Sequence, residues 1–350
     1  MTELIDVPPG LRGVAVTSTE IGDVLGREGY YHYRGRSAVE LARSAPFEAV
    51  AALVLDGSTA PLDPDRSLPA PVAALVDRID LRTGISLLGT TLGFRPLVEI
   101  SSDERRADAV RLIGAMPTLV ASILRGEAVA PEPSLGHVAD FLRMVTGAPA
   151  PAERVRALEA YFVLTIDHGF SNSAFATRVV ASSGADLGAC ALAGFGSLSG
   201  PRHGADVERV LAMFDAIGEP ERAEDWLRAE MAGGRRLQGF GHSVYQRPDP
   251  RLGLLREFGA ALAPDRHRMA LAVEAAGSRL LAGRRLEPNL DLHAPVVLEG
   301  CGLPRGSFTA TFATARVVGW CAHALEQAGE SRIVRPAAHY VGPPPEPPDR

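Results

Sequence analysis

Apolar residues recur every three or four positions along most of the chain beyond residue 35. The spacing is clearest at residues 104–125, 155–183, 204–218, 267–284 and 307–328. Apolar residues at such intervals form one face of an α-helix, so the pattern predicts helical structure over these stretches. We find no series of alternating strands and helices, and the sequence therefore predicts a mainly α fold.

The N-terminal part of the chain carries other signals. Residues 11–35 alternate polar and β-prone residues around glycines, which predicts short β-hairpins. The stretch "SAVELARSAPFEAVAALVLDG" predicts two short helices that end at Gly57. Further along, we expect a loop at residues 127–134 and a frayed tail at the proline-rich residues 343–350.

The composition is that of a globular protein with a substantial core. Of 350 residues, 46% are hydrophobic and 22% are charged, and the net charge of −6 gives no general reason to expect nucleic-acid binding. The chain contains no lysine. That absence excludes a P-loop lysine and a lysine that forms a Schiff base with a substrate or with pyridoxal phosphate.

The cysteines and the N-terminus indicate in which cellular compartment we expect the protein. Three cysteines, Cys190, Cys301 and Cys321, stand far apart without CxxC spacing, which is typical of free thiols in a reducing environment. The stretch "MTELIDVPPG" is acidic and interrupted by prolines, unlike a signal peptide. We also expect no apolar run long enough to span a membrane. Together these features predict a soluble cytoplasmic protein.

Common catalytic motifs are missing from the sequence. None of the nine histidines has HxH or HExxH spacing, so we expect no metal site. Neither a GxSxG nucleophile elbow nor a GxGxxG dinucleotide fingerprint occurs. The chemistry must therefore rest on other residues.

Three histidines are candidates. His168 lies in "IDHGFSNSAFATR", where we expect a helix that also carries Arg178, and a buried core histidine is the alternative there. His203 and His242 each have glycine beside them, in "SGPRHGAD" and "LQGFGHSVYQ". Glycine permits positive φ and close approach of a ligand to the backbone. The two stretches are either ordinary loops or the holders of two catalytic imidazoles at one cleft.

One carboxylate and three arginines complete the set. Asp291, between two leucines, either caps a turn or is a partly desolvated base, because burial raises a carboxyl pKa. Arg316 stands in an apolar helix and needs an anion, either a structural carboxylate or a ligand. Arg251 follows Asp249 closely enough to pair with it, and Arg335 lies in an extended segment before a proline. Arginine suits bidentate carboxylate binding, so the set indicates proton transfer on a carboxylate-bearing substrate.

The chain resembles the citrate synthase family, 2-methylcitrate synthases included. The motifs that carry the resemblance occur in the family's order almost from end to end: "DHGFSNSAFATRVVASSGADL", "SGPRHGA", "GFGHSVYQRPDPR", "PNLDL", "ARVVGWCAHALEQ" and "RPAAHYVGP". The resemblance implies a two-domain helical fold with a short N-terminal β-hairpin region. Residues 1–204 and 302–350 would form the large domain, and residues 205–301 the small one.

The resemblance also implies a reaction and roles for the candidate residues. Acyl-CoA and oxaloacetate would condense in a Claisen-type step, and thioester hydrolysis would release CoA, with no permanent cofactor and no metal. Asp291 would remove the α-proton, His203 would stabilise the enol and His242 would polarise the ketone. The oxaloacetate carboxylates would be bound by His168, Arg251, Arg316 and Arg335. In a homodimer, Arg335 would act in the partner's site. The adenine of CoA would meet the backbone of Leu237, Gln238, Gly239, Phe240 and Gly241.

Departures from the family pattern leave the substrates open. Ser243 follows His242 where arginine is common, and Leu292 and His293 follow Asp291 where aromatic residues are common. We expect Leu292 and His293 to shape the acyl pocket and to allow use of propionyl-CoA. The alternatives are a longer acyl-CoA, another 2-oxo acid, or a non-catalytic member that acts as a binding protein.

Overall fold

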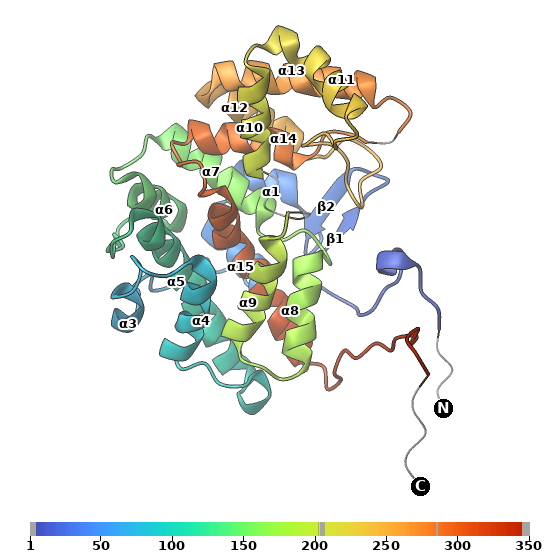
Figure 1. The fold of residues 1–350 in the computed structure, drawn as a ribbon. Helices are drawn as coiled ribbons and strands as arrows, with labels where there is room; N and C mark the ends of the chain where they lie inside the picture. Colours follow the sequence, from blue (N-terminus) through green and yellow to red (C-terminus); the bar gives the residue numbers. More distant parts are fainter. Residues whose placement is uncertain (1–4, 202, 204–206, 285, 345–350) are drawn as a thin grey trace.

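A computed structural model describes residues 5–201, 203, 207–284 and 286–344. Over these residues it contains fifteen α-helices and one three-stranded antiparallel sheet, so the mainly α class is confirmed (Figure 1). The sheet comprises β1 (Gly22–Leu25), β2 (Tyr30–Tyr33) and β3 (Arg36–Ser37). The predicted short hairpins are thus confirmed over residues 22–37, whereas residues 12–21 form no strand.

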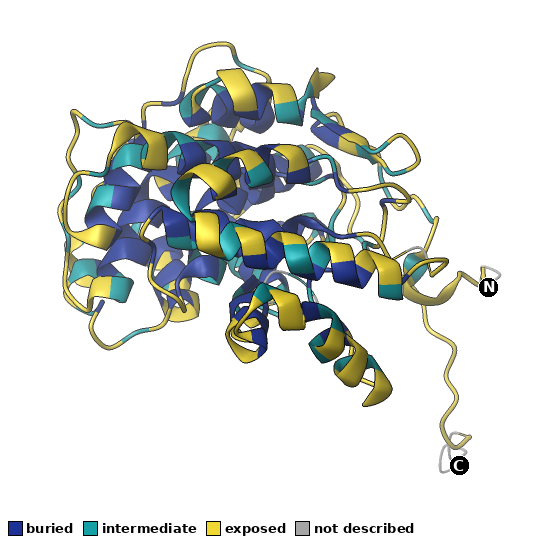
Figure 2. Ribbon diagram, turned by 90° about the horizontal axis from the view of Figure 1, so that it is seen from above, coloured by how far each residue is buried: buried dark blue, intermediate teal, exposed yellow. Residues whose placement is uncertain are grey.

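The first nine helices and the last one form the lower body in Figure 1. Their bounds are α1 (Ala38–Ser44), α2 (Phe47–Asp56), α3 (Ala70–Ala73), α4 (Leu81–Thr91), α5 (Ser102–Arg125), α6 (His137–Thr146), α7 (Ala152–Thr165), α8 (Asn172–Ser182), α9 (Leu187–Leu198) and α15 (Phe308–Ala328). Helix α15 is buried along most of its length and contacts α2, α5, α7, α8 and α9, so it forms the centre of this body. Seen from above, the buried residues line the inner faces of the helices (Figure 2).

The two predicted N-terminal helices are confirmed as α1 and α2. Helix α2 ends at Gly57, which takes a left-handed conformation with φ 79°. The loop at 127–134 is confirmed too. In the tail, residues 343 and 344 have no regular structure, and 345–350 lie outside the described residues.

The prediction of helical structure across residues 155–183 is wrong in one respect. The chain leaves the helix after Thr165 and begins the next one at Asn172, capped by the side chain of Ser171. Gly169 adopts φ +58° within the break. His168 therefore lies in a loop rather than in a helix, whereas Arg178 is helical as expected.

The N-terminal hairpin is fastened to α7, directly before this break. Tyr31 Oη donates to the carbonyl of Leu164 at 3.0 Å, and Tyr33 Oη donates to that of Val163 at 2.8 Å. Both tyrosines are buried because alternate residues of a strand face the same side. The hairpin therefore lies beside the loop that carries His168.

A second group of helices lies at the top of Figure 1. It comprises α10 (Val207–Ile217), α11 (Ala223–Ala232), α12 (Leu252–Leu262), α13 (Pro264–Leu280) and α14 (Leu290–Gly300). Helices α12 and α14 contact α7, which joins this group to the lower body. The division into domains at 204/205 and 301/302 stays a prediction, and residues 204–206 lie outside the described residues.

Helix α5 contradicts the expectation that no apolar stretch is long enough to span a membrane. By length and hydropathy it could do so, yet 67% of its apolar window is buried inside the protein. A buried helix of this kind is a core element of a folded body, because its apolar side chains already have protein partners.

Candidate active site

His168 and His242 come together from different parts of the chain. Their rings lie 5.4 Å apart in an edge-to-face arrangement. The hydroxyl of Tyr245 lies 2.9 Å from His168 Nε2, and its ring lies 4.5 Å from that of His242. Burial lowers the pKa of His168 well below its usual value, and the charge of Arg251 adds to the effect. This imidazole is neutral at ordinary pH.

The backbone fixes the tautomer of His242. Its Nδ1 accepts the backbone N–H groups of Val244 and Tyr245, each at 3.0 Å. Burial, and then the charge of Arg251, lower its pKa to about 4. A neutral imidazole carries one proton, and since Nδ1 accepts, that proton lies on Nε2. His242 therefore offers an N–H donor without a positive charge.

His203 lies in a turn that follows α9. Its Nε2 is 3.1 Å from the hydroxyl of Ser173 in α8, and its backbone N–H donates to the carbonyl of Gly200. Burial lowers its pKa to about 4, and the charge of Arg316 contributes. Gly204, the glycine predicted to free its backbone, lies outside the described residues.

Arg251 pairs with Asp249, one of the two alternatives that the sequence left open. The guanidinium binds the carboxylate through two hydrogen bonds, Nε to Oδ1 at 2.8 Å and Nη2 to Oδ2 at 2.6 Å, and both residues are buried. Asp249 Oδ2 also accepts the backbone N–H of Leu290 at 3.0 Å. The pair therefore fixes the start of α12 against the start of α14.

Arg316 has no such partner. Among the described residues, no carboxylate lies within ion-pair distance of its guanidinium, whose Nε donates to the carbonyl of Thr165 at 2.7 Å. The side chain is 2% exposed and covers the ring of Phe312 at 4.8 Å. Burial lowers the pKa of Arg316. A buried cation with one carbonyl partner is electrostatically suited to bind an anion.

Asp291 stands in the first turn of α14, and Asn289 rather than Asp291 caps that helix. Asn289 Oδ1 accepts the backbone N–H of Asp291 at 2.9 Å. The position of Asp291 in the first turn suits an anion, because the helix dipole is positive there. Its side chain is partly exposed, which leaves it accessible to a substrate.

The glycine loop at 237–241 runs directly beside this helix start. Gly241 N–H donates to the carbonyl of Glu287, Asn289 N–H donates to that of Gly239, and Asn289 Nδ2 donates to the carbonyl of Gly241 at 2.7 Å. Gly239 and Gly241 have φ of +77° and +88°. A Cβ on Gly239 would lie 2.9 Å from the Cβ of Leu292. Glycine is required here because the loop contacts α14 closely.

The expectation that Leu292 and His293 both shape the acyl pocket needs a correction. Leu292 lies against Gly239 of the loop. The His293 ring is fully buried and faces α13, where its Nε2 lies 2.7 Å from Glu274 Oε2. Successive residues of a helix point about 100° apart, so His293 cannot share the orientation of Asp291 two positions earlier.

Arg335 is not brought to the other candidates within one chain. It is exposed in the extended segment beyond α15. The neighbouring Val334 N–H donates to Ser182 Oγ at 3.0 Å, at the C-terminal end of α8. The loop with His168 precedes the other end of that helix.

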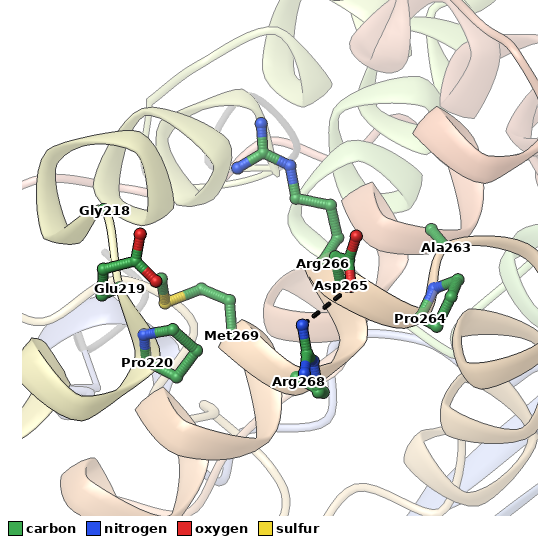
Figure 3. A pocket seen from close by; sticks show the side chains of 9 residues that line it. All are labelled: Gly218, Glu219, Pro220, Ala263, Pro264, Asp265, Arg266, Arg268 and Met269. Atoms are coloured by element: carbon green, nitrogen blue, oxygen red, sulfur yellow. Dashed lines mark hydrogen bonds and ion pairs between the residues drawn. The ribbon is translucent and has the colours of Figure 1, made fainter.

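Two pockets open on the upper helices. One, of about 540 Å³, lies between the loop after α10 and the start of α13, where Arg268 donates to Asp265 (Figure 3). It contains none of the predicted site residues. The other, of about 480 Å³, is bordered by Leu237 and Gln238 of the glycine loop and by Arg209, Trp226, Arg235 and Arg236, among others. Arg235 pairs with Glu230 at the same border, and the positive charge that remains in excess there suits an anionic ligand.

Sequence reasoning did not identify Tyr245, Ser173 and Asn289, which hold or cap candidate residues. Tyr245 and Asn289 stand three and two residues from His242 and Asp291, so local spacing was a usable signal for them. Ser173 is thirty residues from His203, and only the packing of the turn against α8 brings them together.

Comparisons with known proteins point to a single family. The family model for the citrate synthase C-terminal domain matches residues 10–337. A citrate synthase of Deinococcus radiodurans is 30% identical over 96% of both chains, and a 2-methylcitrate synthase of Mycobacterium tuberculosis is 32% identical over 96% of this chain and 91% of its own. A solved citrate synthase of Thermoplasma acidophilum, in ternary complex with carboxymethyl coenzyme A and oxaloacetate, shares 27% identity over 97% of both chains with a TM-score of 0.90.

Proposed function

The chain belongs to the citrate synthase family, and on that premise we propose how its own residues perform the family's reaction. The enzyme condenses an acyl-CoA with oxaloacetate and hydrolyses the resulting thioester, which gives CoA and citrate or 2-methylcitrate. By reaction class it is an acyltransferase in which the acyl group becomes an alkyl group on transfer.

The tautomer of His242 is the observation that carries this assignment. A neutral Nε2–H donor can polarise the ketone of oxaloacetate without delivering a proton prematurely. His203, also neutral, donates to the thioester oxygen of the acyl-CoA as the enol develops. Asp291 takes the α-proton, which is so weakly acidic that the enol must be stabilised in place by fixed donors.

The arginines hold the other substrate. Arg316 has a buried guanidinium without a carboxylate partner among the described residues, which supports its binding of an oxaloacetate carboxylate. Arg251 shares its charge with Asp249 but lies close enough to lower the pKa of both His168 and His242. It adds positive potential to the oxaloacetate site, and His168 adds a neutral hydrogen-bonding group.

The CoA moiety binds along the loop Leu237–Gly241. The pocket beside Leu237 and Gln238, with three arginines at its border, supports the placing of CoA phosphates there. The acyl group then reaches Asp291, because the loop and the start of α14 are joined by hydrogen bonds. CoA acts as a substrate, and no permanent cofactor takes part.

The active form is a homodimer with shared sites. Arg335 is exposed and lies beyond α15, away from the loop with His168 in its own chain. A residue at this place serves an oxaloacetate site most simply in a second subunit. The enzyme acts in the cytoplasm, a location that its three buried free thiols support.

The acyl donor includes propionyl-CoA. Leu292 stands against the glycine loop. Leucine is smaller than the aromatic residue that the family commonly has at this position, which supports acceptance of a larger acyl group. One methylene group more or less in an apolar pocket changes the discrimination between two substrates by about 1–3 kcal/mol.

Release of CoA from acetyl-, propionyl- and butyryl-CoA with oxaloacetate, in the presence of EDTA, tests the proposal. We expect turnover with both acetyl- and propionyl-CoA. An acetyl preference above about a thousandfold exceeds that range and contradicts the propionyl assignment. Asp291→Asn is the matched control: it should bind oxaloacetate but lose turnover by far more than tenfold, which is about 1.4 kcal/mol. A wild-type chain that binds both substrates without turnover would instead be the non-catalytic binding protein.

A further inference from the structure

Tyr161, in α7, carries a hydroxyl group that the packing of its ring does not explain. It is fully buried, and its ring lies edge-to-face against Phe312 at 6.3 Å. Its hydroxyl has no hydrogen-bond partner among the described residues. The hydroxyls of Tyr31 and Tyr33, which pack on the same helix, donate to α7 carbonyls. A buried hydroxyl without a partner is costly, so phenylalanine would satisfy the packing better than tyrosine does.

The surroundings of the hydroxyl are those of the active site. The guanidinium of Arg316 covers the Phe312 ring that Tyr161 also contacts. Helix α7 contacts α12, α14 and α15, which begin at or carry Arg251, Asp291 and Arg316. All three charges act on the phenol. Burial raises its pKa, so the group is a neutral O–H donor at any working pH.

We propose that Tyr161 is a substrate-binding residue whose hydroxyl donates a hydrogen bond to the oxaloacetate carboxylate held by Arg316. The inference rests on the proposed function and deepens it. A donor beside a cation that lacks a carboxylate partner completes an anion site, because a carboxylate accepts several hydrogen bonds at once. Donation to Asp291 instead would weaken that carboxylate as a base, which is the opposite of what the reaction needs.

Tyr161→Phe removes the hydroxyl and keeps the ring. We expect oxaloacetate to bind at least tenfold more weakly by calorimetry, equivalent to 1.4 kcal/mol, and the KM for acyl-CoA to stay unchanged. The unliganded variant should melt at the same temperature as wild type or higher, because an unpaired buried hydroxyl has been removed. Tyr30→Phe, at an exposed site on β2, is the matched control and should change neither quantity.

Three results would overturn the proposal. Unchanged oxaloacetate affinity together with a lower melting temperature would make the hydroxyl structural. Unchanged affinity with a lower kcat would mean that it acts through Asp291. A wild-type protein that neither binds nor turns over oxaloacetate would overturn the proposed function itself, and this result is distinct because it appears without any substitution.

Discussion

Asn289 joins the two halves of the catalytic site, and Asn289→Ala is expected to loosen both. Its Oδ1 caps α14 at the N–H of Asp291, and its Nδ2 holds the carbonyl of Gly241, next to His242. Loss of an N-cap costs about 1 kcal/mol. The partly buried carbonyl of Gly241, left without its donor, costs about as much again. Urea unfolding should therefore show a free energy of unfolding lower by about 2 kcal/mol.

The effect on activity should be larger than the effect on stability implies. A displacement of about 1 Å in a reacting group can cost about a hundredfold in rate. We expect kcat/KM for oxaloacetate to fall about tenfold to a hundredfold, measured at a temperature where the variant is fully folded. Both Asp291 and His242 would then be less well oriented, although neither has been altered.

Asn289→Ser separates the two contacts. Serine is a good N-cap, so about 1 kcal/mol of stability should return, but its side chain is too short to reach Gly241. Activity should stay low if the link to the loop is what matters. Full activity in the serine variant would show that the cap alone positions Asp291. The reasoning would be refuted if the alanine variant kept its kcat/KM and its free energy of unfolding stayed within about 0.5 kcal/mol of wild type, which is less than the usual cost of a lost cap.

Three further predictions concern the pH dependence of activity, the pH dependence of stability, and the assembly of the sites. Because burial holds the pKa of His203 and His242 at about 4, kcat/KM should show no acid limb near pH 6.5, and a limb centred there would contradict the neutral-imidazole assignment. Both imidazoles are neutral in the folded chain above their pKa of about 4, whereas in the unfolded chain they gain a proton below about pH 6.5. The free energy of unfolding should therefore fall as pH drops from 6.5 to 4, by at most about 2 kcal/mol for each histidine at pH 5. Urea titrations can measure this loss. Arg335→Ala and Asp291→Asn, each inactive alone, should regain about a quarter of wild-type activity when refolded together, since half of random dimers are mixed and each mixed dimer has one intact site. Inactive mixed dimers, verified by native mass spectrometry, would place Arg335 in its own subunit's site.

Local structure followed from local sequence in much of the chain. The helical spacing located α5, α10, α13 and α15, and Gly57 located the end of α2. These features depend on contacts between residues a few positions apart, which periodicity and capping residues encode directly. The ordered motifs indicated the family for a similar reason, because each is a short stretch with its own loop or helix start.

The break that holds His168 depended on tertiary contacts. The apolar spacing runs on through residues 155–183, although Gly169 and Ser171 were present as local signals for a helix end and start. In the folded chain, Asp167 Oδ2 accepts the N–H of Gly169, and Tyr33 of the hairpin donates to the carbonyl of Asp167. That second contact joins residues 134 positions apart, which no window of sequence can reveal.

The electrostatic character of the site was likewise decided by the fold. In the sequence, Arg251 and Arg316 are both candidates for anion binding, with a structural carboxylate as the alternative for each. In the structure Arg251 pairs with Asp249, whereas Arg316 donates to the carbonyl of Thr165 and has no carboxylate partner among the described residues. His293 stands two residues from Asp291 yet faces α13. Sequence determines which residue types are present and which side of a helix is apolar. Whether a charge is paired and whether an imidazole is neutral depend on burial and on neighbours from distant segments, and these exist only once the chain has folded.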